Sequence, residues 1–175
     1  EDVALFFGYL CGDGCIYANK DNRGSSYVGS THGMEDPDFI DWARSEFKKI
    51  FEGCHLQEYK YKDRKAYAFK VSSKPLMLWA KKAGISKKYV PEIIKRSPQK
   101  IVKAFLKGFF ETDGSIGEKS NGQRISASSS RKSLIEEIQL LLLKAGIPSL
   151  IRHVVAKMPD GKEHDGWHII IPTAY

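Results

Sequence analysis

Hydrophobic residues recur every three or four positions in two stretches of the chain, which predicts two amphipathic helices. The first helix would begin at Asp36-Pro37 and end at Gly53. The second would have Ser130 as its N-cap and would end at Gly146. Their apolar faces consist of Phe39, Ala43, Phe47 and Ile50 in the first and of Leu134, Ile138, Leu141, Leu142 and Ala145 in the second.

Alternation of polar and apolar residues predicts two pairs of antiparallel strands in each half of the chain. The expected strands are Cys15–Ala18, Ser26–Ser30, His55–Tyr61 and Ala66–Ser72, then Ser115–Glu118, Arg124–Ser128, Ser149–Lys157 and His164–Ile171. Further helices are expected near Lys74–Ala83, after Pro91 and from Pro98. The fold class is therefore α+β, with two αββαββ(α) halves, of which the second lacks the final helix. That gap raises the expectation that the chain is a piece of a longer protein.

A nine-residue segment with Gly at its third place and Asp-Gly at its end occurs before the first hairpin of each half. Residues 6–14 read FFGYLCGDG and residues 106–114 read LKGFFETDG. Since the copies lie a hundred residues apart and similar elements follow both, the chain divides into 1–97 and 98–175. We expect these two halves to form one compact, pseudo-dimeric unit.

Composition favours a polyanionic partner. The 175 residues carry 28 Lys and Arg against 21 Asp and Glu, a net charge of +7, and such a surplus attracts phosphates. A basic surface kept for solubility is the alternative. The three cysteines form no CxxC pair, which indicates buried thiols in an intracellular, reducing compartment rather than a zinc site or a disulfide framework. We expect no signal peptide and no membrane segment.

The repeated segments suggest a chemistry for their final acids. Gly8 and Gly12 lie on one helical face, where small residues let two helices pack closely. Two such helices, packed together, would end side by side and bring Asp13 and Asp113 together. A divalent cation would relieve the repulsion between the two carboxylates. We expect Mg²⁺, with added ligands from the backbone carbonyls of Gly12 and Thr112.

An Asp-Gly pair after an apolar helix is often only a helix stop. An acid at a helix C-terminus, however, is unfavourable against the helix dipole. Two such acids at matching places in a basic chain therefore favour a functional role.

Both segments resemble the LAGLIDADG motif of homing endonucleases, in the two-motif, single-chain branch. The stretch from Val90-Pro91-Glu92 through Ser97-Pro98 to Gly108 is similar to endonuclease domains carried by inteins. The resemblance implies a monomer with internal pseudo-two-fold symmetry, whose motif helices form the central interface. It implies two antiparallel sheets that make a saddle over double-stranded DNA. It also implies a double-strand cut in a long, asymmetric or pseudo-palindromic target, with Mg²⁺ bound by Asp13 and Asp113. Ca²⁺ is expected to replace Mg²⁺ without supporting cleavage.

The sixth place of the motif departs from the family pattern, with Cys11 in one copy and Glu111 in the other. We interpret Cys11 as buried packing and Glu111 as a structural or solvent-facing acid. The family also places polar or basic residues around its metals. Candidates here are His32, after the second strand, and Lys74, with loop and helix-start roles as their alternatives. The second half has no lysine at the place that matches Lys74.

The polar face of the sheets is expected to contact bases and phosphates. The candidates are Tyr17, Asn19, Lys20, Arg23, Tyr59, Tyr61, Lys62, Arg64, Lys70, Arg124, Ser126, Arg152 and Lys157. Two alternative functions on the same scaffold remain, an RNA maturase and a catalytically silent DNA-binding protein. Protein splicing is not expected, because the chain has neither a nucleophile at its start nor a His-Asn pair at its end.

Overall fold

A computed structural model of the chain describes residues 1–18, 26–85, 89–119, 122–157, 161 and 163–172. The first half contains α1 (Asp2–Gly12), β1 (Gly14–Tyr17), β2 (Tyr27–Gly33), α2 (Pro37–Ile50), β3 (Leu56–Tyr61), β4 (Ala66–Ser72) and α3 (Lys74–Lys82). The short helix α4 (Glu92–Arg96) leads to the second half. That half contains α5 (Gln99–Asp113), β5 (Gly114–Lys119), β6 (Gly122–Ser129), α6 (Lys132–Lys144), β7 (Leu150–Lys157) and β8 (Glu163–Pro172).

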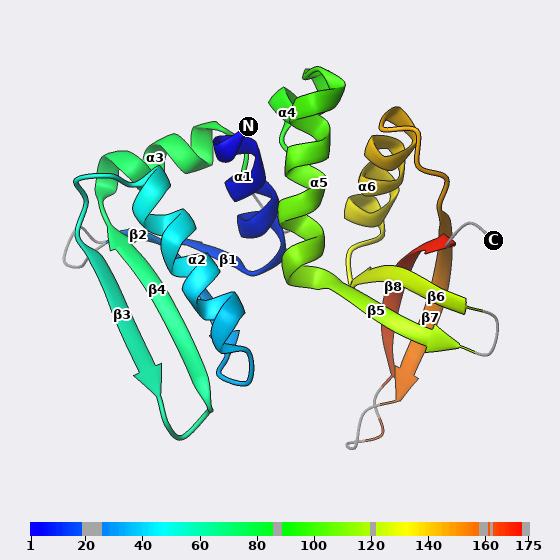
Figure 1. Cartoon of the computed structure of the whole chain (residues 1–175), viewed down its shortest axis with the longest axis horizontal. Helices are drawn as coiled ribbons and strands as arrows, with labels where there is room; N and C mark the ends of the chain where they lie inside the picture. Colours follow the sequence, from blue (N-terminus) through cyan, green and yellow to red (C-terminus); the bar gives the residue numbers. More distant parts are fainter. Residues whose placement is uncertain (19–25, 86–88, 120–121, 158–160, 162, 173–175) are drawn as a thin grey trace.

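The two halves have the same sheet topology, which confirms the predicted α+β fold. The strand orders are β1-β2-β4-β3 and β5-β6-β8-β7, and every pair is antiparallel. Helices α1 and α5 lie side by side at the centre of the molecule, and one sheet extends from the lower end of each (Figure 1). The division of the chain at residues 97 and 98 stays a prediction.

Glycines set how closely α1 and α5 approach each other. A Cβ atom added to Gly8 would lie 1.9 Å from the carbonyl oxygen of Phe105, and one added to Gly108 would lie 1.9 Å from that of Leu5. Both contacts are with backbone, which cannot turn aside as a side chain can. The two helices are thus packed backbone to backbone, as the spacing of small residues predicts.

One continuous hydrophobic core joins the halves around this helix pair. Phe6 and Tyr9 on α1 pack against Phe47 on α2, and Phe105 and Phe109 on α5 are also completely buried. Because the motif helices contribute side chains to this core, their orientation is fixed by packing on both sides. No helix among the described residues is long and apolar enough to cross a membrane.

The predicted start of α2 is confirmed, whereas that of α6 is wrong. The side chain of Asp36 accepts a hydrogen bond from the backbone N–H of Phe39, 2.9 Å away. Helix α6 begins after Arg131 instead of Ser130, with no side-chain cap. Strand β6 stays paired through Ser129, so Ser130 falls in the bend between strand and helix.

Two other expectations need correction. Strand β2 continues to Gly33, because the pairing with β4 extends to Gly33 opposite Ala66. His32 therefore lies within a strand, rather than in a loop after it. Of the cysteines, Cys11 is buried as expected, but Cys15 and Cys54 are exposed.

Replacing Gly8 by Ala should destabilise the protein, because the new methyl group would push α1 away from α5. We expect a loss of about 1–3 kcal/mol in the free energy of unfolding, measured by urea denaturation. Gly33→Ala is the matched control, since nothing lies within 4 Å of a Cβ at that position. Equal unfolding midpoints for the two variants would contradict the close helix contact.

Candidate functional site

The last acids of the two repeated segments lie at the neighbouring ends of α1 and α5. Asp13 directly follows α1, and Asp113 is the last residue of α5. A Cβ atom added to Gly12 would lie 2.0 Å from Oγ1 of Thr112 and 3.3 Å from Cγ of Asp113. The second acid therefore packs against the residue that precedes the first. This is the arrangement that the repeat predicts.

His32 lies directly behind Asp13. Its Nδ1 is 2.9 Å from Oδ2 of Asp13, and the histidine is only 6% exposed. The Asp13 side chain is 33% exposed, so one side of the carboxylate faces His32 while another part of it reaches solvent. Because His32 is almost fully buried, its contact with Oδ2 holds the carboxylate of Asp13 in one orientation.

Two further buried groups bind the other nitrogen of His32. Its Nε2 lies 2.5 Å from the hydroxyl of Tyr9 and 2.9 Å from Oγ of Ser30, and these two hydroxyl groups are also hydrogen-bonded to each other. Burial raises the pKa of Tyr9 well above its ordinary value, and the nearby charge of Asp13 adds to this, although the Ser30 bond opposes it. The phenol therefore stays protonated and can donate a hydrogen bond.

A pocket of about 230 Å³ opens beside Asp13 and His32. It lies between the halves, because Glu111 and Thr112 of α5 also line it. Its other lining residues are Gly33, Glu35, Asp36 and Phe39. Glu35 is not among the site residues that the sequence predicts, and Glu111 is predicted there to be structural or solvent-facing. A pattern that could have pointed to Glu111 is its place in the motif, where the family often has an acid.

The residues at this pocket fit a hard divalent cation. Asp13 and Glu111 offer carboxylate oxygens, the donors that Mg²⁺ prefers. Among the described residues, no group of three or more His, Cys, Asp or Glu side chains could hold an ion. Water and phosphate oxygens would have to complete the coordination shell, which is usual for Mg²⁺ at phosphate-binding sites.

The structure does not bring Lys74 to this pocket. Lys74 is the first residue of α3, just beyond the end of β4 at Ser72, which pairs with Tyr27. His32 pairs with Tyr67 toward the other end of the same strand. Lys74 therefore lies at the far end of the sheet from Asp13.

Aromatic side chains form a row across the outer face of the first sheet. The rings of Tyr17 and Tyr27 stack at 5.3 Å, and those of Tyr59 and Tyr61 at 6.3 Å. The ammonium group of Lys70 lies between these pairs, 4.9 Å from the Tyr27 ring and 4.8 Å from the Tyr59 ring. These contacts hold Lys70 in place on the face predicted to bind DNA.

The outer face of the second sheet has a different chemistry. The register puts Arg124 opposite Gly117 and Ser126 opposite Ser115, whose hydroxyl groups lie 3.0 Å apart. Arg152 is exposed on β7. Ser126 is only 7% exposed, so its hydroxyl is not presented on this face as predicted. The two sheets thus present an aromatic row with a lysine in one half and arginines in the other.

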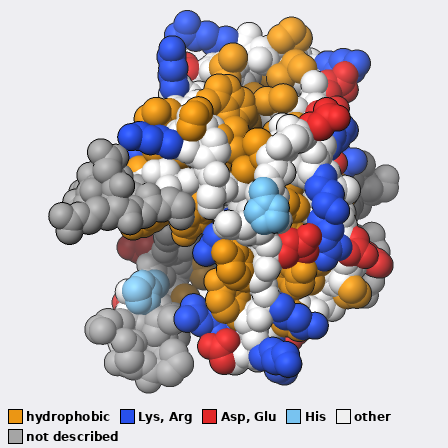
Figure 2. Space-filling model, turned by 90° about the vertical axis from the view of Figure 1, so that its left-hand side faces the viewer, with side chains coloured by type: hydrophobic (Ala, Val, Ile, Leu, Met, Phe, Trp, Pro, Cys, Tyr) orange, Lys and Arg blue, Asp and Glu red, His pale blue; other side chains and the backbone are white. Residues whose placement is uncertain are grey.

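The other predicted contact residues lie at turns and strand ends. Lys62 and Arg64 are in the exposed turn between β3 and β4, where the guanidinium of Arg64 lies 5.7 Å from the Tyr61 ring. Lys157 is the last residue of β7. Asn19, Lys20 and Arg23 lie outside the described residues. On the side of the first half seen in Figure 2, Lys and Arg side chains are interleaved with hydrophobic ones.

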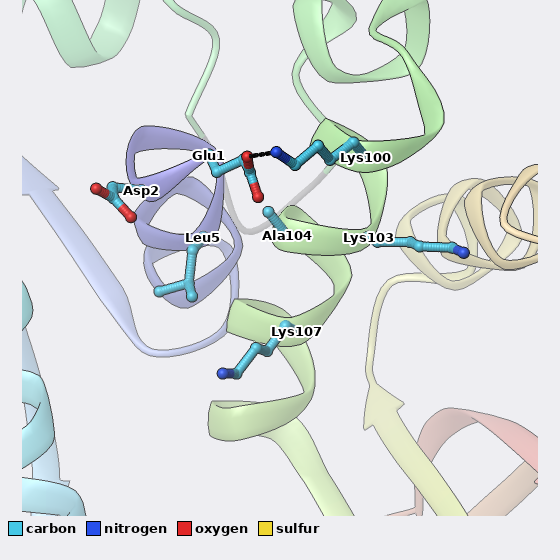
Figure 3. A pocket seen from close by; sticks show the side chains of 7 residues that line it. All are labelled: Glu1, Asp2, Leu5, Lys100, Lys103, Ala104 and Lys107. Atoms are coloured by element: carbon cyan, nitrogen blue, oxygen red, sulfur yellow. Dashed lines mark ion pairs between the residues drawn. The ribbon is translucent and has the colours of Figure 1, made fainter.

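A second pocket, of about 360 Å³, lies at the opposite end of the helix pair from the acids. Figure 3 shows that its lysines do not converge: Lys100 is paired with Glu1, Lys103 points the other way, toward α6, and Lys107 lies further along α5 on the same side as Lys100. Because these charges do not converge, we do not assign a binding site there.

Comparison with known proteins identifies relatives of both halves. A model of the LAGLIDADG-like domain matches residues 100–174. The replication factor C small subunit of Methanocaldococcus jannaschii is 30% identical over 99% of this chain, and the uncharacterised protein MJ0314 of the same organism is 30% identical over 84%. The chain spans only 9% and 55% of the lengths of these two proteins.

Solved structures share the fold across nearly the whole chain. The homing endonuclease I-DmoI, in complex with DNA and Mn, superposes with a TM-score of 0.67 at 20% identity, covering 98% of this chain and 89% of that one. The N-terminal LAGLIDADG domain of DUF199/WhiA gives a TM-score of 0.59 at 9% identity, covering 98% and 75%. Residues 100–174 thus match the LAGLIDADG-like domain, and the whole chain, with its paired motifs at the centre of two matching sheets, has the fold of the homing endonuclease I-DmoI.

Proposed function

We propose that this chain is a site-specific DNA endonuclease, which makes a metal-dependent double-strand cut in a long, asymmetric or pseudo-palindromic target. The observation that carries the proposal is that Asp113, at the end of α5, lies against Gly12, the residue before Asp13 at the end of α1. One acid comes from each half, as a reaction on two DNA strands requires.

Each acid has a role that follows from its position. Asp13 and Asp113 would hold divalent cations, with the carbonyls of Gly12 and Thr112 as added ligands. Bound Mg²⁺ would stabilise the attacking and leaving oxygens of the phosphodiester. Glu111, which lines the same pocket, would hold a water molecule there. His32 would keep the Asp13 carboxylate in one orientation.

The metal assignment agrees with structures of I-DmoI, which were solved with DNA in the presence of Mn, Ca or Mg. For this chain we assign Mg²⁺ as the ion that supports cutting. We assign Ca²⁺ as an ion that supports DNA binding alone.

The two sheets would bind the DNA on either side of the acids. The tyrosine row offers apolar edges to bases, and Lys70 and Arg152 offer cations to phosphates or guanine. Because the two sheet faces differ, the two halves of the target should differ in sequence. We assign the protein as a monomer on this basis.

Purified protein with Mg²⁺ should cut a defined sequence within a library of randomised DNA duplexes, and sequencing of the ends would identify it. Failure to cut any member would refute the nuclease assignment. Binding without cutting would indicate a silent DNA-binding protein, and preferential binding to structured RNA would indicate a maturase.

Asp13→Asn and Asp113→Asn should each reduce double-strand cutting by at least about 100-fold, because an amide is a much weaker ligand for Mg²⁺. Binding to the target in Ca²⁺, measured by fluorescence anisotropy, should be retained. Asp38→Asn, an exposed change at the start of α2, is the control and should cut normally. Normal cutting by either motif variant would overturn the metal assignment.

Target affinity should fall steeply with salt, because binding releases counterions from the phosphates. Arg152→Ala should reduce the slope of log K against log salt by about 1 if Arg152 contacts a phosphate. Lys49, in the last turn of α2, is paired with Asp2. Lys49→Ala should therefore leave the slope unchanged. Equal slopes for all three proteins would exclude Arg152 from the interface.

A further inference from the structure

In the first half, buried polar side chains lie behind the motif acid Asp13. In the second half, other residues occupy the equivalent positions. Strand pairing fixes the equivalent positions: Ser30 lies opposite Gly14, and Ala127 lies opposite Gly114. Two residues further along each strand, His32 corresponds to Ser129. At the fourth place of the motif, Tyr9 corresponds to Phe109.

The three polar groups of the first half are almost inaccessible to solvent. Tyr9 is 0% exposed, Ser30 2% and His32 6%. The His32 ring also packs edge-on against Phe39, with centroids 5.0 Å apart. Because polar groups are costly to bury, three adjacent ones in a core need an explanation.

The second half indicates that the fold does not require them. Phe109 and Ala127 occupy the equivalent positions at 0% and 2% exposure, in a sheet of the same topology. Ser129 lies at the start of the turn into α6, where its hydroxyl accepts a hydrogen bond from the backbone N–H of Arg131. The polar groups of the first half therefore have a role beyond folding.

One arrangement of protons gives every donor in the cluster an acceptor, and it leaves the 2.9 Å contact between Nε2 of His32 and Oγ of Ser30 without a hydrogen. His32 donates from Nδ1 to the carboxylate of Asp13, so its Nε2 is an acceptor. The Tyr9 hydroxyl donates to Nε2, and the Ser30 hydroxyl donates to the Tyr9 oxygen. This chain fixes both the tautomer and the ring orientation of His32, as outer partners of metal ligands do.

We propose that Tyr9 and Ser30 are positioning residues that act through His32 on Asp13 alone, so that the two DNA strands depend on different parts of the protein. This inference rests on the proposed nuclease function. Loss of the cluster should slow the cutting of one strand and leave the other unchanged, and nicked DNA should accumulate.

The test uses the full chain, Mg²⁺ and a target duplex whose two strands carry different dyes, with enzyme in excess. Tyr9→Phe and Ser30→Ala introduce the residues of the second half, and His32→Gln removes the ring. We expect His32→Gln to slow one strand by about 10- to 100-fold relative to the other. The other two variants should change the same ratio in the same direction. Ser129→Ala is the matched control and should leave the ratio unchanged.

The ratio of the two rates is measured within one population of molecules, so partial unfolding lowers both rates equally and does not change it. An unchanged ratio in Tyr9→Phe, Ser30→Ala and His32→Gln would overturn the inference while leaving the nuclease assignment intact. A wild-type protein that cuts neither strand would instead overturn the nuclease assignment, and this inference with it.

Discussion

The contact between α1 and α5 is the constraint on which the rest of the structure depends. Gly8 and Gly108 allow each helix to touch the backbone of the other, and this contact brings the following acids, Asp13 and Asp113, to one place. Each helix also leads directly into the first strand of its own sheet. The same contact therefore positions the two acids and the two sheets. A bulkier residue at either glycine would move all of these together.

Much of this arrangement could be predicted from the sequence, because it depends on local signals that occur twice. The repeat with its glycines predicted the helix pair, and alternation predicted both strand pairs. Contacts between residues that are far apart in the sequence were harder to predict from it. His32 could be named as a candidate, but its approach to Asp13 depends on how far the pairing of β2 continues. The distance of Lys74 from Asp13 likewise depends on strand register, which local patterns do not encode.

Pseudo-symmetry in this molecule is a property of the backbone more than of the side chains. The two sheets share their topology, yet by strand pairing the positions of Tyr27 and Lys70 are taken in the second half by Arg124 and Ile170. Likewise, Phe109 and Ala127 stand at the positions that Tyr9 and Ser30 occupy in the polar cluster behind Asp13. Once two halves are joined in one chain, each can change separately, which suits an asymmetric ligand such as DNA with two different half-sites.

The central claim is that the acids at the ends of α1 and α5 bind catalytic metal. Anomalous scattering from crystals grown with target DNA and Mn²⁺ tests it most directly, because it locates the ions without reference to activity. We predict anomalous peaks within about 2.5 Å of carboxylate oxygens of both Asp13 and Asp113. Peaks confined to other acidic residues, or none near these two in a crystal whose DNA occupies the sheets, would contradict the claim.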